Sequence, residues 1–135
     1  MDKIFSKLSQ LPPRTGLALS YVICINICAF IRNSLKIVLW YGFRSFYFNE
    51  WLVDFFTLVS FFIMFMCGGI MGYLIHKNSV FHAALAVALG VAYTYLLSGV
   101  SSTEFYYFIR NVMAGFILGG SGGGAILLVR KIRNN

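Results

Sequence analysis

The chain has 135 residues, of which 59% are hydrophobic and only 11% charged, with a formal net charge of +7. A soluble domain of this size carries charge on roughly a quarter of its residues, so the composition excludes a soluble globular protein. The apolar residues are gathered into blocks of about twenty, the length that crosses the hydrocarbon core of a bilayer. They predict an all-α polytopic membrane protein, one domain over 1–135, with four transmembrane helices.

Residues 2–11, DKIFSKLSQL, place apolar and basic side chains on different faces of a helix, and Pro12 and Pro13 then end it. This pattern predicts a short amphipathic helix on the membrane surface, with a solvated tail as the alternative. No cleavage pattern of small residues follows before Arg32, so we expect the first apolar block to be kept as a helix.

Four apolar blocks follow, at 16–43, 51–75, 80–100 and 111–129. The first block is interrupted by Arg32 and Lys36. It is therefore either one long tilted helix or a short span followed by an interfacial segment. The long helix is favoured because neither proline nor glycine occurs between residues 17 and 41.

Basic residues set the expected orientation. If the N-terminus is cytoplasmic, seven basic residues lie on the cytoplasmic side and two on the outer side. The seven are Lys3, Lys7, Arg14, Lys77, Arg130, Lys131 and Arg133, and the two are Arg44 and Arg110. The bias predicts that both termini are cytoplasmic. Aromatic residues around the two outer loops fit the headgroup region of a membrane.

The stretch 114–131, AGFILGGSGGGAILLVRK, contains six glycines. Its dinucleotide-like pattern is not preceded by a strand, and no lysine follows the glycines, so a nucleotide-binding loop is disfavoured. A linker facing lipid would leave backbone amides without partners. We therefore expect a continuous helix. The alternative is a helix broken at Gly119–Gly124, as in transporters with half-helices.

On a helix, Gly115, Gly119 and Gly123 recur every four residues and, together with Gly122, form one face. Such a GxxxG pattern lets another backbone approach closely within a membrane. The second block has one further GxxxG pair, and the third has a small-xxx-small pair. The candidate packing residues are Gly68, Gly72, Ala86, Gly90, Gly115, Gly119, Gly122 and Gly123. Most of them are expected near mid-depth or in the cytoplasmic half.

Charges within a span are costly and point to function. Arg32, Lys36 and Asp54 are the candidates, with Lys36 expected to pair with Asp54. The functional interpretation is a polar track for an ion or a proton. The structural one is that Arg32 and Lys36 lie at the interface beneath the aromatic residues.

The remaining chemistry is sparse. Cys24, Cys28 and Cys67 lie in apolar surroundings and are interpreted as small buried residues. His76 and His82 are spaced too widely for a metal pair on one helix. No catalytic set is apparent, so we expect no enzyme activity, cofactor, metal or nucleic-acid partner.

The second half, GGIMGYLIHKNSVFHAALAVALG followed by AGFILGGSGGGAILLVRK, resembles small bacterial membrane families of uncharacterised function. In these families a GGxxG helix, a small-residue helix and a glycine-rich closing helix recur. The resemblance covers about half of the chain. It implies a four-helix protein of the bacterial inner membrane and no particular activity.

Two functional hypotheses follow. The first is a non-enzymatic accessory protein, a subunit or an immunity-type protein, that packs against partner helices through its glycine faces. The second is a small oligomeric transporter or channel with Arg32, Lys36 and Asp54 along its path. The expected partners are the lipid bilayer and either another membrane protein or further copies of the chain.

Overall fold

The computed structural model describes residues 13–42, 50–75, 77–98 and 105–133, and these form four helices. They are α2 (Pro13–Gly42), α3 (Glu50–Leu74), α4 (Ser79–Ser98) and α5 (Phe105–Arg133). Each helix is long and apolar enough to cross a membrane. The prediction of an all-α protein with four candidate spans is confirmed. The expected amphipathic segment at 2–11 lies outside the described residues.

The first apolar block forms a single helix. α2 runs without interruption from Pro13, whose fixed φ and missing N–H suit the first position of a helix. Arg32 and Lys36 therefore lie within one 30-residue helix. The glycine-rich block is likewise continuous, because α5 passes through Gly119–Gly124 without a break. The structure thus differs from the broken-helix alternative.

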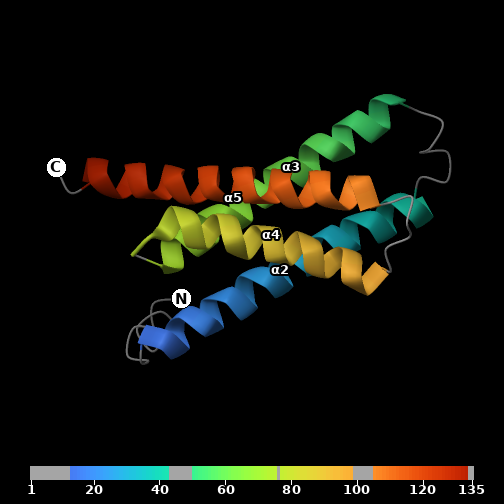
Figure 1. The fold of residues 1–135 in the computed structure, drawn as a ribbon. Helices are drawn as coiled ribbons and strands as arrows, with labels where there is room; N and C mark the ends of the chain where they lie inside the picture. Colours follow the sequence, from blue (N-terminus) through green and yellow to red (C-terminus); the bar gives the residue numbers. More distant parts are fainter. Residues whose placement is uncertain (1–12, 43–49, 76, 99–104, 134–135) are drawn as a thin grey trace.

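A tight turn joins α3 to α4. The amide of Ile75 donates to the carbonyl of Met71 (3.0 Å) after α3 ends, and the amide of His82 donates to the carbonyl of Asn78 (3.1 Å) in the first turn of α4. Asn78 has a φ of 54°, a left-handed conformation that asparagine tolerates better than most residues. We call this side of the molecule the turn end. The opposite side, where α2 and α4 end and α3 and α5 begin, is the loop end (Figure 1).

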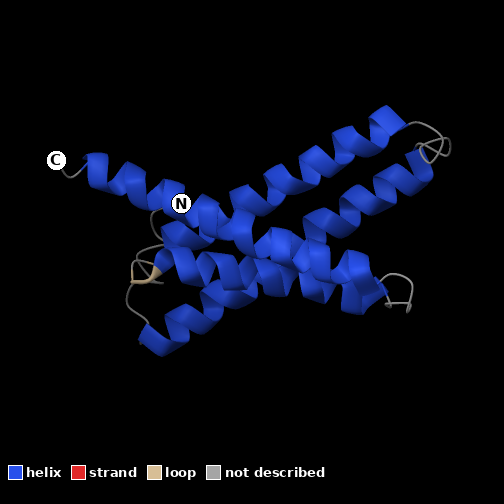
Figure 2. Ribbon diagram, turned by 45° about the horizontal axis from the view of Figure 1, so that its top comes forward, coloured by secondary structure: helices blue, strands red, loops and turns tan. Residues whose placement is uncertain are grey.

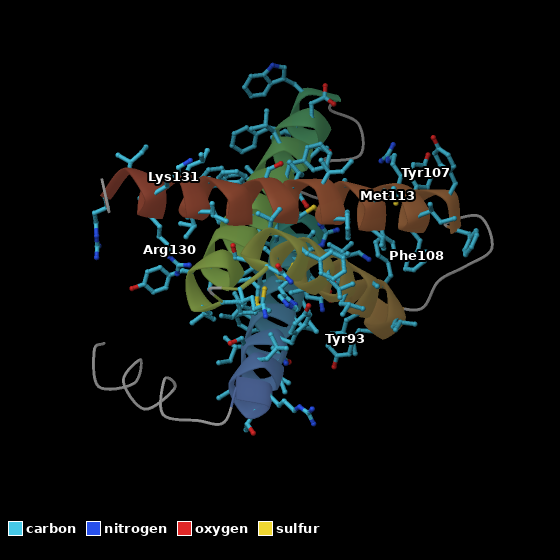
Figure 3. All side chains as sticks on the ribbon, turned by 60° about the vertical axis from the view of Figure 1, so that its left-hand side comes forward. Tyr93, Tyr107, Phe108, Met113, Arg130 and Lys131 are labelled. Carbon is cyan, nitrogen blue, oxygen red and sulfur yellow. The ribbon has the colours of Figure 1, made fainter. Side chains whose placement is uncertain are left out.

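The helices form two crossed pairs rather than a parallel bundle. In Figure 3, α2 and α3 run upright while α4 and α5 run across them. Figure 2 shows the loop-end halves of α2 and α3 leaving α4 and α5. α4 is the most buried of the four helices and α2 the least. The contacts that hold the pairs together are therefore concentrated near the crossing.

The buried residues follow the crossing. Among the described residues of α2 they end at Ala29, and among those of α3 they begin at Met64. The buried apolar cluster consists of Cys24, Cys28, Met64, Cys67, Met71, Ile75, Ala83, Ala86, Val87 and Val91. Large apolar side chains toward the loop end are exposed instead, such as Phe30 (73% exposed) and Phe62 (60%). The core thus lies at the crossing and toward the turn end.

Candidate functional site

The GxxxG pair of α3 lies directly against the glycines of α5. A Cβ atom placed on Gly68 would lie 2.6 Å from the Cα of Gly119, and one on Gly72 would lie 2.7 Å from the Cα of Gly123. Cβ atoms in proteins essentially never come within 3.0 Å of such atoms, so α5 can approach α3 this closely only because Gly68 and Gly72 have no side chain. Gly122 extends this contact, because its Cβ would lie 2.8 Å from the amide nitrogen of Gly69.

The other side of the α5 glycine face contacts α4. A Cβ on Gly119 would lie 2.7 Å from the Cβ of Val87, and one on Gly123 would lie 2.7 Å from the Cβ of Ala83. Gly115 is less tightly enclosed, at 3.0 Å from a methyl group of Val91. α5 therefore fits into the groove between α3 and α4, with its glycines serving both contacts.

The two candidate packing residues of α4 have different surroundings. Ala86 is fully buried in the core. Gly90 faces α2, where its Cβ would lie 2.9 Å from the Cβ of Cys28. All eight candidate packing residues therefore lie at buried positions within this chain. The glycine faces are occupied by the chain's own helices and are not free to bind another protein.

Three cysteines lie close together between α2 and α3. The thiol of Cys24 donates to the carbonyl of Cys67 (3.6 Å), and Cys28 belongs to the same buried cluster. All three cysteines are buried and free. Among the described residues, no group of three or more potential ligands has a geometry suited to a metal ion. The prediction that the three cysteines are small buried residues agrees with their burial in the structure.

Arg32 continues the buried face of α2. Ser20, Cys24, Cys28 and Arg32 follow one another at intervals of four residues, so they lie along one side of the helix. The first three are buried, whereas Arg32 lies just beyond the last buried position of α2, where the two helix pairs separate. Its guanidinium group therefore stands at the edge of the core.

The guanidinium group of Arg32 has few partners. Its Nη1 donates a hydrogen bond to the Oγ of Ser60 on α3 (2.7 Å). Its Nε is buried and has no acceptor among the described residues. The titratable groups that act on it are Cys28, Tyr95 and Cys67, and thiols and phenols are ordinarily neutral at neutral pH. The described part of the chain thus gives this cation no carboxylate.

A second polar contact joins α4 to α5 near the same level. The side-chain amide of Asn111 donates to the hydroxyl of Tyr95, whose ring meets Phe108 edge to face with centroids 5.5 Å apart. The sequence did not predict this pair. The available signal was a polar residue near the end of the third apolar block and another at the start of the fourth, on either side of the same connecting loop. We refer to Arg32, Ser60, Tyr95 and Asn111 as the polar cluster, and each helix contributes one of its members.

The expected pairing of Lys36 with Asp54 is wrong. Both side chains are exposed, and the structure shows no ion pair between them. At their level α2 and α3 have already left the core, so neither side chain is held against a neighbouring helix. Arg32 is partly buried, whereas Lys36 and Asp54, which were expected to form a polar track with it, are exposed.

The turn end carries two further polar contacts. Tyr21 and the Nδ1 of His82 share a hydrogen bond of 2.9 Å that links α2 to α4. Arg130 on α5 donates to the carbonyl of Ile75 (3.5 Å) and to that of Tyr73, and lies over the Tyr73 ring. Figure 3 shows Arg130 on the side of α5 that faces the turn and Lys131 on the other side. His76 lies outside the described residues.

These features define a multi-pass helical membrane protein with a glycine-packed crossing and a partly buried arginine beside it. The chain matches no family model, no curated protein and no solved structure.

Proposed function

We propose that the chain is a non-enzymatic accessory protein of the bacterial inner membrane, a subunit or immunity-type protein that binds a partner within the bilayer. The observation that carries this proposal is the uncovered loop-end half of α2 and α3. Large apolar and aromatic side chains are exposed there on both helices. They are Phe30, Ile37, Val38 and Tyr41 on α2, and Trp51, Phe55, Leu58 and Phe62 on α3.

In this proposal the glycine faces act indirectly. They are used inside the chain, where they hold the two helix pairs in a crossed arrangement. That arrangement keeps the loop-end halves of α2 and α3 away from α4 and α5, so a partner helix can lie against them. Association between helices in lipid depends on close packing and on polar contacts, because lipid is as apolar as the side chains. Arg32 supplies one such polar contact beside the exposed surface.

Position-specific photocrosslinking tests the proposal. A photoreactive phenylalanine analogue replaces Phe62 on α3 or Phe30 on α2, and the matched control replaces Leu128 on α5, which is also largely exposed. We expect the first two positions to capture the same protein in native membranes and the control position to capture lipid. Capture of the same proteins at all three positions would contradict a defined binding surface.

A small oligomeric transporter or channel is the second candidate, and the partly buried Arg32 favours it. The Asp54→Asn variant distinguishes the accessory function from transport. If this variant loses ion or proton flux in proteoliposomes but still binds its partner, transport is supported. Flux that is unchanged in this variant counts against a path along Arg32, Lys36 and Asp54.

The Gly119→Leu variant is expected to disrupt either function. Its side chain would push α5 away from α4 at the crossing, on which both functions depend.

A further inference from the structure

Arg32 and its partner Ser60 both lie far from the ends of their helices. Both residues lie inside candidate spans, Arg32 ten positions before the end of α2 at Gly42 and Ser60 ten positions after the start of α3 at Glu50. At 1.5 Å per residue, both side chains begin about 15 Å from these helix ends. Arg32 and Ser60 therefore meet within the hydrocarbon region.

A cation at this depth requires compensation. Placing a charge in the hydrocarbon region is costly, and intramembrane arginines almost always pair with another group or face water. A guanidinium group has five N–H donors in a planar fork that matches the two oxygens of a carboxylate. Here one donor has an acceptor in Ser60, and the buried Nε has none among the described residues. A negatively charged acceptor would bind the remaining N–H donors of Arg32 and also balance its charge.

We propose that Arg32 is the centre of an anion-binding site within the membrane, which takes one singly charged group of carboxylate size. Ser60 orients the guanidinium group through Nη1, leaving Nε and the remaining N–H groups for the anion. On the α4 side, the hydroxyl of Tyr95 acts on Arg32 electrostatically and accepts a hydrogen bond from Asn111.

Two sources can supply this chemistry. One is an aspartate or glutamate on a partner helix seated against α2 and α3, and this source rests on the proposed accessory function. The other is a free small anion such as formate, and this source does not need a partner. Both give Arg32 the same acceptor, so the experiment has one arm for each source.

The first arm uses the full chain purified in nanodiscs of zwitterionic lipid, where no anionic headgroup competes. Sodium formate replaces sodium sulfate at constant ionic strength, because sulfate is divalent and strongly hydrated. Binding to the folded state raises the Tm, and we expect a rise of about 5 °C at saturating formate. Arg32→Gln should abolish the rise. Lys36→Gln, which removes the same charge one turn away on the same helix, should keep it.

Folding of the variant is controlled within this arm. If Arg32 is uncompensated in sulfate, Arg32→Gln removes an unpaired charge and should melt no lower than the parent. A formate-dependent rise that persists in Arg32→Gln would overturn the proposal, because the anion then binds elsewhere.

The second arm uses complexes purified from native membranes. If a partner supplies the carboxylate, the parent and Lys36→Gln retain that partner and Arg32→Gln loses it. Neutralising the partner's intramembrane acid should cause the same loss. A partner retained by Arg32→Gln, with no formate effect in the parent, overturns the anion site and leaves the accessory function standing. A formate effect with no partner leaves the anion site and contradicts the accessory function.

Discussion

Gly119 and Gly124 lie on the same helix within the same glycine-rich stretch, yet their surroundings differ. A Cβ on Gly119 would lie 2.7 Å from the Cβ of Val87 and 2.8 Å from the carbonyl oxygen of Ala83. The nearest atom to a Cβ on Gly124 is a methyl group of Val80 at 4.0 Å, an ordinary contact. One position thus requires glycine, while the other accepts a methyl group.

These two positions give a matched pair of substitutions. We expect Gly119→Ala to lower the free energy of unfolding by about 1–3 kcal/mol, because the added methyl group overpacks a backbone contact. Gly124→Ala should be neutral or stabilising by up to about 1 kcal/mol, since alanine is the better helix former. Unfolding by a denaturing detergent in mixed micelles measures both. Equal losses in the two variants would show that the stretch has no preferred packing face.

Several polar side chains within the spans form local hydrogen bonds to their own helix. Ser20, Thr94 and Ser121 each donate to the carbonyl four residues earlier, at 2.8, 2.9 and 2.9 Å. Such bonds remove the cost of a hydroxyl group in lipid without a partner helix. Arg32 cannot be satisfied in this way, because its charge remains after its hydrogen bond to Ser60. Among these polar residues, Arg32 is therefore the strongest candidate for a functional role.

At the scale of the element, α5 organises the fold. It is continuous through its glycines and contacts α3 on one side and α4 on the other. Its end is held to the end of α3 by the hydrogen bonds from Arg130 to the carbonyls of Tyr73 and Ile75. A single helix thus joins the two crossed pairs at the crossing and again at the turn end.

Cysteine crosslinking tests the register of α3 against α5. On a background with the native cysteines replaced by alanine, Gly69→Cys and Ile126→Cys should form a disulfide on oxidation. A Cβ on Gly69 lies 3.8 Å from the Cγ1 of Ile126, which brings the two Cβ atoms near disulfide range. The control pairs Gly69→Cys with Leu128→Cys, whose position is 61% exposed. Peptide mapping by mass spectrometry should find the first disulfide only, and the reverse result would place α5 in another rotation.

At the scale of the whole molecule, four spans bring the two described termini to the same side. Pro13 and Arg133 both lie at the turn end, with the α3–α4 turn between the spans (Figure 1). The excess of basic residues in these parts favours the cytoplasm as that side. The proposed topology makes a direct prediction about chemical labelling.

Single cysteines on the cysteine-free background test the topology. Lys77→Cys and Arg133→Cys should react with a bulky aqueous maleimide in inverted vesicles and not in intact cells, whereas Tyr106→Cys should show the opposite pattern. Ser121→Cys should resist the reagent from both sides, because the exposed Ser121 side chain faces lipid in this topology. Labelling of Ser121→Cys as readily as Lys77→Cys would contradict a membrane-spanning α5.

The sequence was a good guide to the elements and a poor one to their pairing. Lys36 and Asp54 were expected to meet because they lie at similar distances from the same loop. Depth alone does not decide contact, since α2 and α3 have separated from the core at that level. Ser60 was not expected as the partner of Arg32, because a serine in an apolar block gives no sign of which helix it faces.

The sequence by itself determined the four helices and the small residues on their faces. Helix length, apolarity and the recurrence of glycine every four residues are local properties of the chain. Only the tertiary structure decided that Gly68 and Gly72 lie against Gly119 and Gly123, and that Arg32 meets Ser60 with no carboxylate from the described part of the chain. These outcomes depend on how each helix is rotated and where the pairs cross. Packing between residues distant in the chain sets both, and no local pattern encodes it.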